Sequence, residues 1–205
     1  IAFDLAFKYR NPAIILADGV IGQMMEKVVL PEQRTRLTDE EVIARCPWAT
    51  TGRTHHRTPN IITSLELDPA EMEKRNIHLQ KKYAEIEENE VRFEELHCED
   101  AEYLIVAFGS CARIAQKAME MAREEGIKVG LLRPITLWPF PSKAIAARAA
   151  QVKGILTVEL NAGQMVEDVR LAVECKVPVE HFGRLGGIVP DPDEVITALK
   201  EKLIK

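Results

Sequence analysis

The sequence predicts an α/β fold in which a parallel or mostly parallel sheet lies between two layers of helices. Two observations lead to this prediction. Short apolar runs alternate with helical patterns through the second half of the chain, which is typical of repeated strand–helix units. The runs are apolar throughout rather than alternating with polar residues, as strands covered on both faces are. They span residues 103–108, 128–132, 154–158 and 178–182.

Helices are predicted between these runs and after the last of them. Helix 112–125 should begin with Ser110 as its N-cap and end at Gly126. The final helix opens at residues 191–194 with an Asp-Pro-Asp-Glu pattern, which combines a capping box with a proline in the first turn. Three prolines in residues 133–141 predict an extended loop, and we expect this loop to expose Trp138 and Phe140.

The first thirty residues predict one strand between two helical segments. A helix should end before Pro12, and residues 13–17 form an apolar run that reads as a buried strand. Asp18 and Gly19 follow at its carboxyl end, where open α/β sheets bind their ligands. The simpler interpretation is that Asp-Gly only makes the turn. The chain also opens inside a helical apolar pattern without a cap, so we expect it to be a piece of a longer polypeptide.

Residues 31–100 are predicted to connect rather than to build a core. A capping box at residues 38–41 begins a short helix, and Asp68-Pro69 begins a second one that should run to about Glu95. Its narrow apolar stripe suits a helix that lies on a surface or bridges domains. The adjacent His55 and His56 suggest a metal site only weakly, because neighbouring side chains point apart.

Composition excludes several classes of function. The net charge of -5 argues against nucleic acid or an anionic membrane as the partner. No apolar run is long enough to be a transmembrane helix. The four cysteines form no Cys-x-x-Cys pair, so local spacing provides neither a zinc ribbon nor an iron–sulfur cluster. Scattered cysteines of this kind are typical of reduced thiols, and we expect a cytoplasmic protein.

Two strand-to-helix turns are candidates for binding. The turn at residues 108–114 has Gly and Ser, which offer N–H groups to a phosphate, but it lacks both Gly-x-Gly-x-x-Gly and the Walker pattern. Cys111 in this turn is either a reactive thiol or, more commonly, a small buried side chain. In the second turn Asn161 and Gln164 form a possible capping box, which leaves Glu159 unexplained and available to a ligand or a partner subunit.

Five stretches together resemble one enzyme family. On them the chain resembles the C-terminal half of the α subunit of 2-oxoacid:ferredoxin oxidoreductases, especially the branched-chain (3-methyl-2-oxobutanoate) and 2-oxoglutarate members. One departure is Cys111, where Ser or Thr is expected. The stretches are ILADGVIGQMME (15–26), WATTG (48–52), LRPITLWPFP (132–141), VELNAGQMVEDVR (158–170) and GRLGGIVP (183–190).

The resemblance implies a domain order. Residues 1–30 would end a thiamine-diphosphate pyrimidine-type domain, residues 31–100 would form a linker with a long helix, and residues 101–205 would form a transketolase C-terminal-like domain. The glutamate that activates thiamine would lie upstream of Ile1, so the chain is assigned no catalytic, cofactor-binding or metal residue.

The resemblance also implies cofactors and partners. Thiamine diphosphate and Mg²⁺ would lie on a partner β subunit, and iron–sulfur clusters on other subunits or domains, with none on this chain alone. The partners would be β-, γ- and δ-type subunits, and ferredoxin and coenzyme A would act through the complex. The expected interface residues are Asp18, Gly19, Gln23, Trp138, Phe140, Asn161, Gly163 and Gln164.

Three functions are therefore compared. The favoured one is a scaffold and interface part of an enzyme that oxidatively decarboxylates a 2-oxoacid to an acyl-CoA and reduces ferredoxin. The second is a part of a transketolase or 2-oxoacid dehydrogenase relative that uses no ferredoxin. The third is an independent nucleotide-binding α/β module. Iron–sulfur subunits in the purified complex would distinguish the first from the second, and saturable ATP or NAD binding would favour the third.

Overall fold

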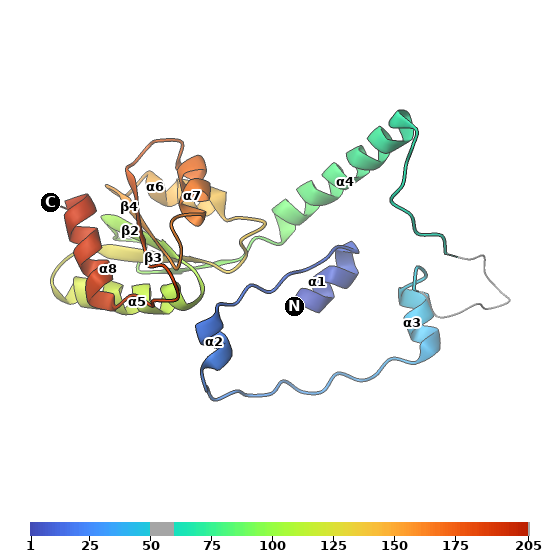
Figure 1. The fold of residues 1–205 in the computed structure, drawn as a ribbon, viewed down its shortest axis with the longest axis horizontal. Helices are drawn as coiled ribbons and strands as arrows, with labels where there is room; N and C mark the ends of the chain where they lie inside the picture. The colour runs from blue at the N-terminus through green and yellow to red at the C-terminus, as the bar shows by residue number, and fades with distance from the viewer. Residues whose placement is uncertain (50–59, 205) are drawn as a thin grey trace. The chain divides into compact units, whose positions relative to one another are not determined.

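The computed structural model describes residues 1–49 and 60–204 (Figure 1). The chain forms two compact units. One combines Ile1–Met24 with Gln80–Lys205, and the other is Met25–Leu79. His55 and His56 lie outside the described residues.

A five-stranded sheet forms the centre of the first unit. The strand order is β1-β3-β2-β4-β5, and β3, β2, β4 and β5 run parallel. The four parallel strands coincide with the four predicted apolar runs, so the expected mostly parallel sheet is confirmed. The strands are β1 (Phe93–Leu96), β2 (Tyr103–Ala107), β3 (Val129–Pro134), β4 (Ile155–Glu159) and β5 (Val179–Gly183).

Helices cover both faces of this sheet, which confirms the three-layer arrangement (Figure 1). On one face, α5 (Gly109–Glu124) and α8 (Pro192–Leu199) pack on side chains such as Ile105 and Leu156. On the other face, α6 (Ser142–Ala149) and α7 (Met165–Val173) pack on Leu104 and Ile155. Successive strand residues therefore point into different cores, which is why these strands are apolar throughout. The chain ends in the short π-helical segment Lys200–Ile204.

Strand β1 was not predicted. The long helix α4 (Pro69–Asn89) ends before the expected Glu95, and Phe93–Leu96 pairs antiparallel with β3 at the edge of the sheet. Its Phe-Glu-Glu-Leu sequence is too short and too charged to show a strand pattern. Tertiary contacts fix it, because Arg133 bonds Glu94 at 3.0 Å and Arg148 bonds Glu95 at 2.6 Å.

The predicted strand at residues 13–17 is wrong. These residues form no regular element, and Ile14, Ile15 and Leu16 are 70–80% exposed. A strand needs a neighbour to pair with its backbone, and the strands of the described residues pair only with one another. The apolar run lies between helix α1 (Ala2–Tyr9), which ends at Arg10 in the left-handed conformation, and the short helix α2 (Gly19–Gln23).

The second unit contains the predicted capping signals. Helix α3 (Asp39–Arg45) has the full capping box between Thr38 and Glu41. At the start of α4 the Asp68 carboxylate accepts bonds from the N–H groups of Ala70 and Glu71. The Glu71 side chain pairs with Lys74 at 2.6 Å.

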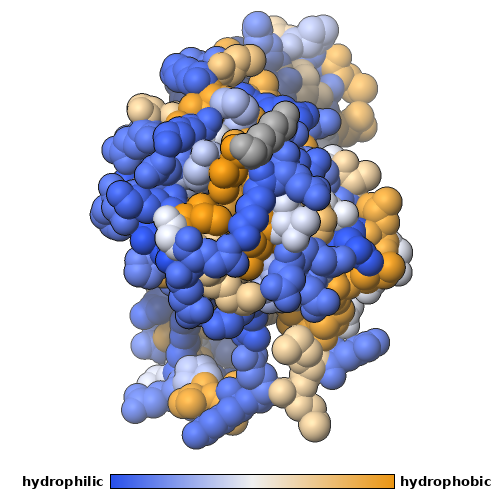
Figure 2. Space-filling view, turned by 90° about the vertical axis from the view of Figure 1, so that its left-hand side faces the viewer, coloured by the Kyte–Doolittle hydropathy of each residue, from blue (hydrophilic) through white to orange (hydrophobic). Residues whose placement is uncertain are grey.

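Two further features of the described residues are the polarity of their surface and the length and apolar character of their helices. Figure 2 shows that charged and polar residues cover most of the face in view, with apolar residues in separate areas between them. Within the described ranges, no helix has both the length and the apolar character needed to cross a membrane.

Candidate functional site

The carboxyl ends of β3, β2 and β4 meet at one edge of the sheet. Because these strands are neighbours and run in the same direction, the loops that follow them share this edge. The loop after β3 carries Trp138 and Phe140, the turn after β2 carries Ser110, and the turn after β4 carries Asn161, Gly163 and Gln164. The structure thus brings loops containing five of the predicted interface residues to one edge.

Glu159 is the central residue of the turn after β4. It is 1% exposed, and both of its oxygens accept bonds from backbone N–H groups at the start of α7. The Oε2 atom bonds Gln164 at 3.1 Å and Met165 at 2.9 Å, and Oε1 bonds Val166 at 3.0 Å. A carboxylate at a helix N-terminus also interacts favourably with the helix dipole.

The predicted capping box of Asn161 and Gln164 is therefore wrong. Gln164 is itself at the N-cap position of α7, without a side-chain capping bond. The Asn161 side chain instead accepts a bond from the Gly163 N–H at 2.7 Å, which makes a local Asx turn. The N–H groups of the first turn are satisfied by Glu159, so this carboxylate is engaged within the chain and not left for a ligand.

His181 on β5 extends this network, and sequence reasoning did not identify it. Its Nδ1 atom lies 3.2 Å from Thr157 Oγ1 and 3.4 Å from Glu159 Oε1. Its Nε2 atom lies 3.3 Å from the carbonyl oxygen of Asn161. The ring therefore links the end of β4 to the turn that follows it. No sequence pattern signals this contact, because it depends on the pairing of β4 with β5.

Asp18 forms a second carboxylate contact, at the end of β2. Ser110 Oγ donates to Asp18 Oδ2 at 2.6 Å, and the Ile21 N–H donates to Oδ1 at 2.8 Å. The hydrogen bond from Ser110, followed by the backbone bond from Ile21, lowers the pKa of the Asp18 carboxyl. Asp18 therefore does more than make a turn, since it joins residues from two distant parts of the chain. Gly19 and Gln23 nearby are exposed.

The expected cap of α5 is also corrected. Phe108 occupies the N-cap position of this helix, and Ser110 lies in its first turn with its hydroxyl directed to Asp18. The adjacent Cys111 is buried, and this burial raises the pKa of its thiol to about 11. The reactive-thiol interpretation of Cys111 is wrong, because a thiol with this pKa stays protonated near neutral pH.

Thiol labelling should separate the four cysteines into two classes. Cys98 and Cys111 are buried, and burial raises the pKa of each to about 11, whereas Cys175 is exposed and Cys46 is half-buried. With a thiol reagent at pH 8 we expect rapid reaction of Cys175, reaction of Cys46, and reaction of the other two only after unfolding. Mass spectrometry of labelled peptides would identify them. Equal labelling rates for Cys111 and Cys175 would contradict this burial.

Trp138 and Phe140 differ in their surroundings. Trp138 is 52% exposed, and its ring meets that of Tyr83 edge-on with 5.8 Å between the centroids. Phe140 is half-buried and packs on the core between the sheet, α6 and α7. The prediction that the loop exposes both aromatic side chains is thus confirmed for Trp138 and wrong for Phe140.

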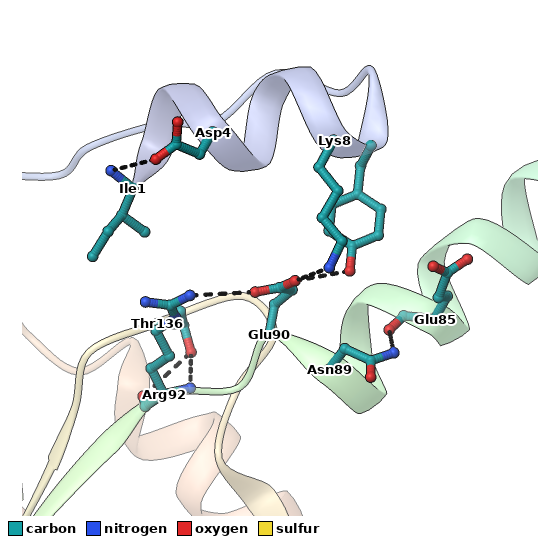
Figure 3. Close-up of polar contacts among 9 residues, drawn as sticks. Ile1, Asp4, Lys8, Glu85, Asn89, Glu90, Arg92 and Thr136 are labelled. Atoms are coloured by element: carbon teal, nitrogen blue, oxygen red, sulfur yellow. Dashed lines mark hydrogen bonds and ion pairs between the residues drawn. The ribbon is translucent and has the colours of Figure 1, made fainter. Parts of the chain in front are cut away.

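A polar cluster around Glu90 holds α1 on the same unit (Figure 3). The Glu90 carboxylate accepts bonds from Lys8 Nζ at 2.7 Å and from the Tyr9 hydroxyl at 2.8 Å. Arg92 contacts the other oxygen at 3.4 Å and also bonds Thr136 through its backbone. The bonds from Lys8 and Tyr9 lower the pKa of Glu90. The sequence gives no sign of contacts between residues about eighty positions apart.

Comparison with known proteins identifies the family. Residues 101–195 match the family described as pyruvate:ferredoxin oxidoreductase core domain II. Over 98% of its length the chain is 45% identical to the ketoisovalerate oxidoreductase subunit VorB of Methanothermobacter marburgensis. The chain belongs to the family of 2-oxoacid:ferredoxin oxidoreductase subunits.

Other members of this family are also similar. The chain is 32% identical over 93% of its length to the 2-oxoglutarate synthase subunit KorA of Archaeoglobus fulgidus. A solved 2-oxoglutarate:ferredoxin oxidoreductase from Magnetococcus marinus superposes with a TM-score of 0.61 at 25% identity, covering 72% of this chain and 28% of that one. The chain spans 55% of the length of VorB and 53% of that of KorA.

The acidic side chains at this edge of the sheet are engaged in hydrogen bonds within the chain. No group of three or more His, Cys, Asp or Glu side chains is placed to hold a metal in residues 1–49 and 60–204. The buried carboxylate at the sheet edge, Glu159, is saturated by N–H groups, and Asp18 accepts bonds with both of its oxygens.

Acidification should release the Asp18 contact in this oxidoreductase chain. The pKa of Asp18 is lowered in the folded state, so the ionised carboxylate stabilises the fold above the unfolded pKa of about 3.9. This stabilisation is lost as the pH falls through the lower, folded pKa. A carbon-13 NMR titration of the Asp18 carboxyl should give a midpoint clearly below about 3.9. A midpoint at or above that value would contradict the bond to Ser110.

Proposed function

We propose that this chain is part of the α-type subunit of a thiamine-diphosphate-dependent oxidoreductase. The complete enzyme would oxidatively decarboxylate a 2-oxoacid to an acyl-CoA and pass the electrons to ferredoxin. The proposed substrate is a branched-chain 2-oxoacid such as 3-methyl-2-oxobutanoate. The proposed role of this chain is to act as scaffold and interface, with the chemistry carried out on other parts of the complex.

One observation carries the proposal of a branched-chain substrate. The identity of 45% to a ketoisovalerate oxidoreductase subunit extends over 98% of the chain, compared with 32% over 93% for the 2-oxoglutarate synthase subunit of Archaeoglobus fulgidus. Ketoisovalerate and 3-methyl-2-oxobutanoate are the same compound.

The geometry of the sheet edge supports a scaffold role. Glu159 stabilises the first turn of α7, and Asp18 bonds Ser110. Both carboxylates are occupied by hydrogen bonds within the chain, and burial raises the pKa of the Cys111 thiol to about 11. The exposed Trp138, Gly19 and Gln23 leave surface for contact with other subunits. Cofactors would lie elsewhere, namely thiamine diphosphate and Mg²⁺ on a β-type subunit and iron–sulfur clusters on other subunits or domains.

Turnover by the complete enzyme tests the proposal. The complex that contains this chain would be purified anaerobically through a tag on the chain, and its subunits identified by mass spectrometry. Ferredoxin reduction would then be measured with 3-methyl-2-oxobutanoate, 2-oxoglutarate and pyruvate, each with and without coenzyme A. We expect iron–sulfur subunits in the complex and a kcat/KM at least about tenfold higher for the branched-chain acid, as one well-filled apolar pocket provides.

The outcomes separate the alternatives. A preference for 2-oxoglutarate or pyruvate would contradict the proposed branched-chain substrate, but the chain would still belong to the same enzyme family. A complex that decarboxylates the acid without iron–sulfur subunits would contradict ferredoxin as the acceptor. If a Trp138→Ala variant still assembles fully, Trp138 is not part of the proposed interface. Leu171→Ala is the control, because Leu171 is also exposed but lies on α7.

A further inference from the structure

The sheet has a topological switch point between β2 and β4. Strands β2 and β4 are adjacent in the sheet. The strand that follows β2 in sequence, β3, lies on one side of this pair, and the strand that follows β4, β5, lies on the other side. In open α/β sheets the crevice outside the carboxyl ends of two such strands is where ligands bind. Here it is bounded by the N-termini of α5 and α7, which present N–H groups suited to an anion.

Two carboxylates of the chain itself lie at these two helix N-termini. Glu159 accepts the N–H groups at the start of α7, and it belongs to the strand immediately before that helix. Asp18 lies at the start of α5, although it is 92 residues away from Ser110 in sequence. The negatively charged group at the start of α5 is therefore the Asp18 carboxylate, which comes from a segment far away in the sequence.

We propose that the end of β2 forms a carboxylate-binding site whose ligand is Asp18 of the same chain. Ser110, which is only 9% exposed, donates its hydroxyl to Asp18 Oδ2, and the second oxygen is held by Ile21. Gly109, with a φ of +59°, makes the turn that begins the helix. The site thereby holds residues 18–24 on the sheet domain and excludes an external phosphate.

The surroundings of α2 explain why this contact determines its position. Helix α2 has no buried residue, and Ile14, Ile15 and Leu16 before it are exposed. No apolar core therefore holds this segment among the described residues. Attachment through Ser110 is specific, because the Asp18 carboxylate must accept from the Ser110 hydroxyl while its other oxygen accepts from the Ile21 N–H.

Hydrogen exchange in the complete enzyme tests the site. The variants are Asp18→Asn, Ser110→Ala and the double variant, and the readout is the exchange rate of amides 19–24 and 110–113. We expect exchange at 19–24 to rise by about tenfold or more in each single variant, with little further rise in the double variant because both changes remove the same bond. Asp193→Asn, which removes an exposed carboxylate from the first turn of α8, should leave these amides unchanged.

Two results would overturn the proposal. The first is unchanged exchange at 19–24 in Asp18→Asn, while amides in β2 show that the sheet remains folded. The second is slower exchange of amides 110–113 when millimolar inorganic phosphate is added to the wild-type enzyme, because the site would then accept an external anion beside Asp18. Amide exchange is measured without substrate, so the result is independent of which 2-oxoacid the enzyme uses.

Discussion

Replacing Glu159 with alanine should lower the free energy of unfolding of the sheet domain by about 3–5 kcal/mol. The carboxylate is 1% exposed and satisfies three backbone N–H groups at the start of α7. Its removal leaves these donors without a partner, and the N–H groups of Met165 and Val166 lie in buried positions where water has little access. Leaving a buried donor unsatisfied costs about 1–3 kcal/mol, so the three together account for the expected loss.

Urea unfolding followed by circular dichroism would measure this loss. Glu167→Ala is the matched control, because Glu167 also lies in the first turn of α7 but is exposed. It should change stability by less than about 1 kcal/mol. Glu159→Gln should lie between the two, since its amide retains one acceptor oxygen. If the Glu159 and Glu167 variants unfold at the same urea concentration, the carboxylate does not cap the helix.

Replacing Gly183 with alanine should also cost about 2–3 kcal/mol or more. A Cβ atom at this position would lie 2.2 Å from the carbonyl oxygen of Asn161 and 2.6 Å from Nε2 of His181. The first of these neighbours is backbone, so relief requires a shift of the turn after β4. The side-chain network of Glu159, Thr157 and His181 would move with it.

Gly22→Ala is the control for this variant. No heavy atom lies within 4 Å of a Cβ built there, and the residue is in the short helix α2. Alanine is favoured over glycine in helices by about 1 kcal/mol, so this change should be neutral or stabilising. Thermal unfolding of both variants provides the comparison. A Gly183→Ala protein as stable as the Gly22→Ala protein would show that the turn can adjust freely.

The sequence predicted the parallel strands because their pattern reflects local surroundings. Leu104, Ile105 and Val106 are buried on alternate faces against different helices, so every position has to be apolar. The helix starts at Thr38 and Asp68 were predicted for a similar reason, since capping involves residues close together in sequence.

Features that depend on distant contacts were missed. Strand β1 is fixed by Arg133 and Arg148, and its own four residues carry no clear pattern. The strand predicted at residues 13–17 shows the reverse case, in which the local pattern is strong but no described strand is available to pair with it. At the candidate site Asp18 and Glu159 stood out in the sequence by their places after predicted strands, whereas their hydrogen-bond partners depend on the arrangement of the sheet.

Strand β1 also affects how the sheet can meet another protein. An edge strand offers unpaired N–H and C=O groups on which a foreign strand can assemble. In this chain the edge beside β3 is closed by only four residues, and two of them are glutamates paired with arginines. A short strand of this charge is a poor template for the addition of another strand. Subunits that bind on this side should therefore dock through side chains and loops, and the sheet should stay at its present width.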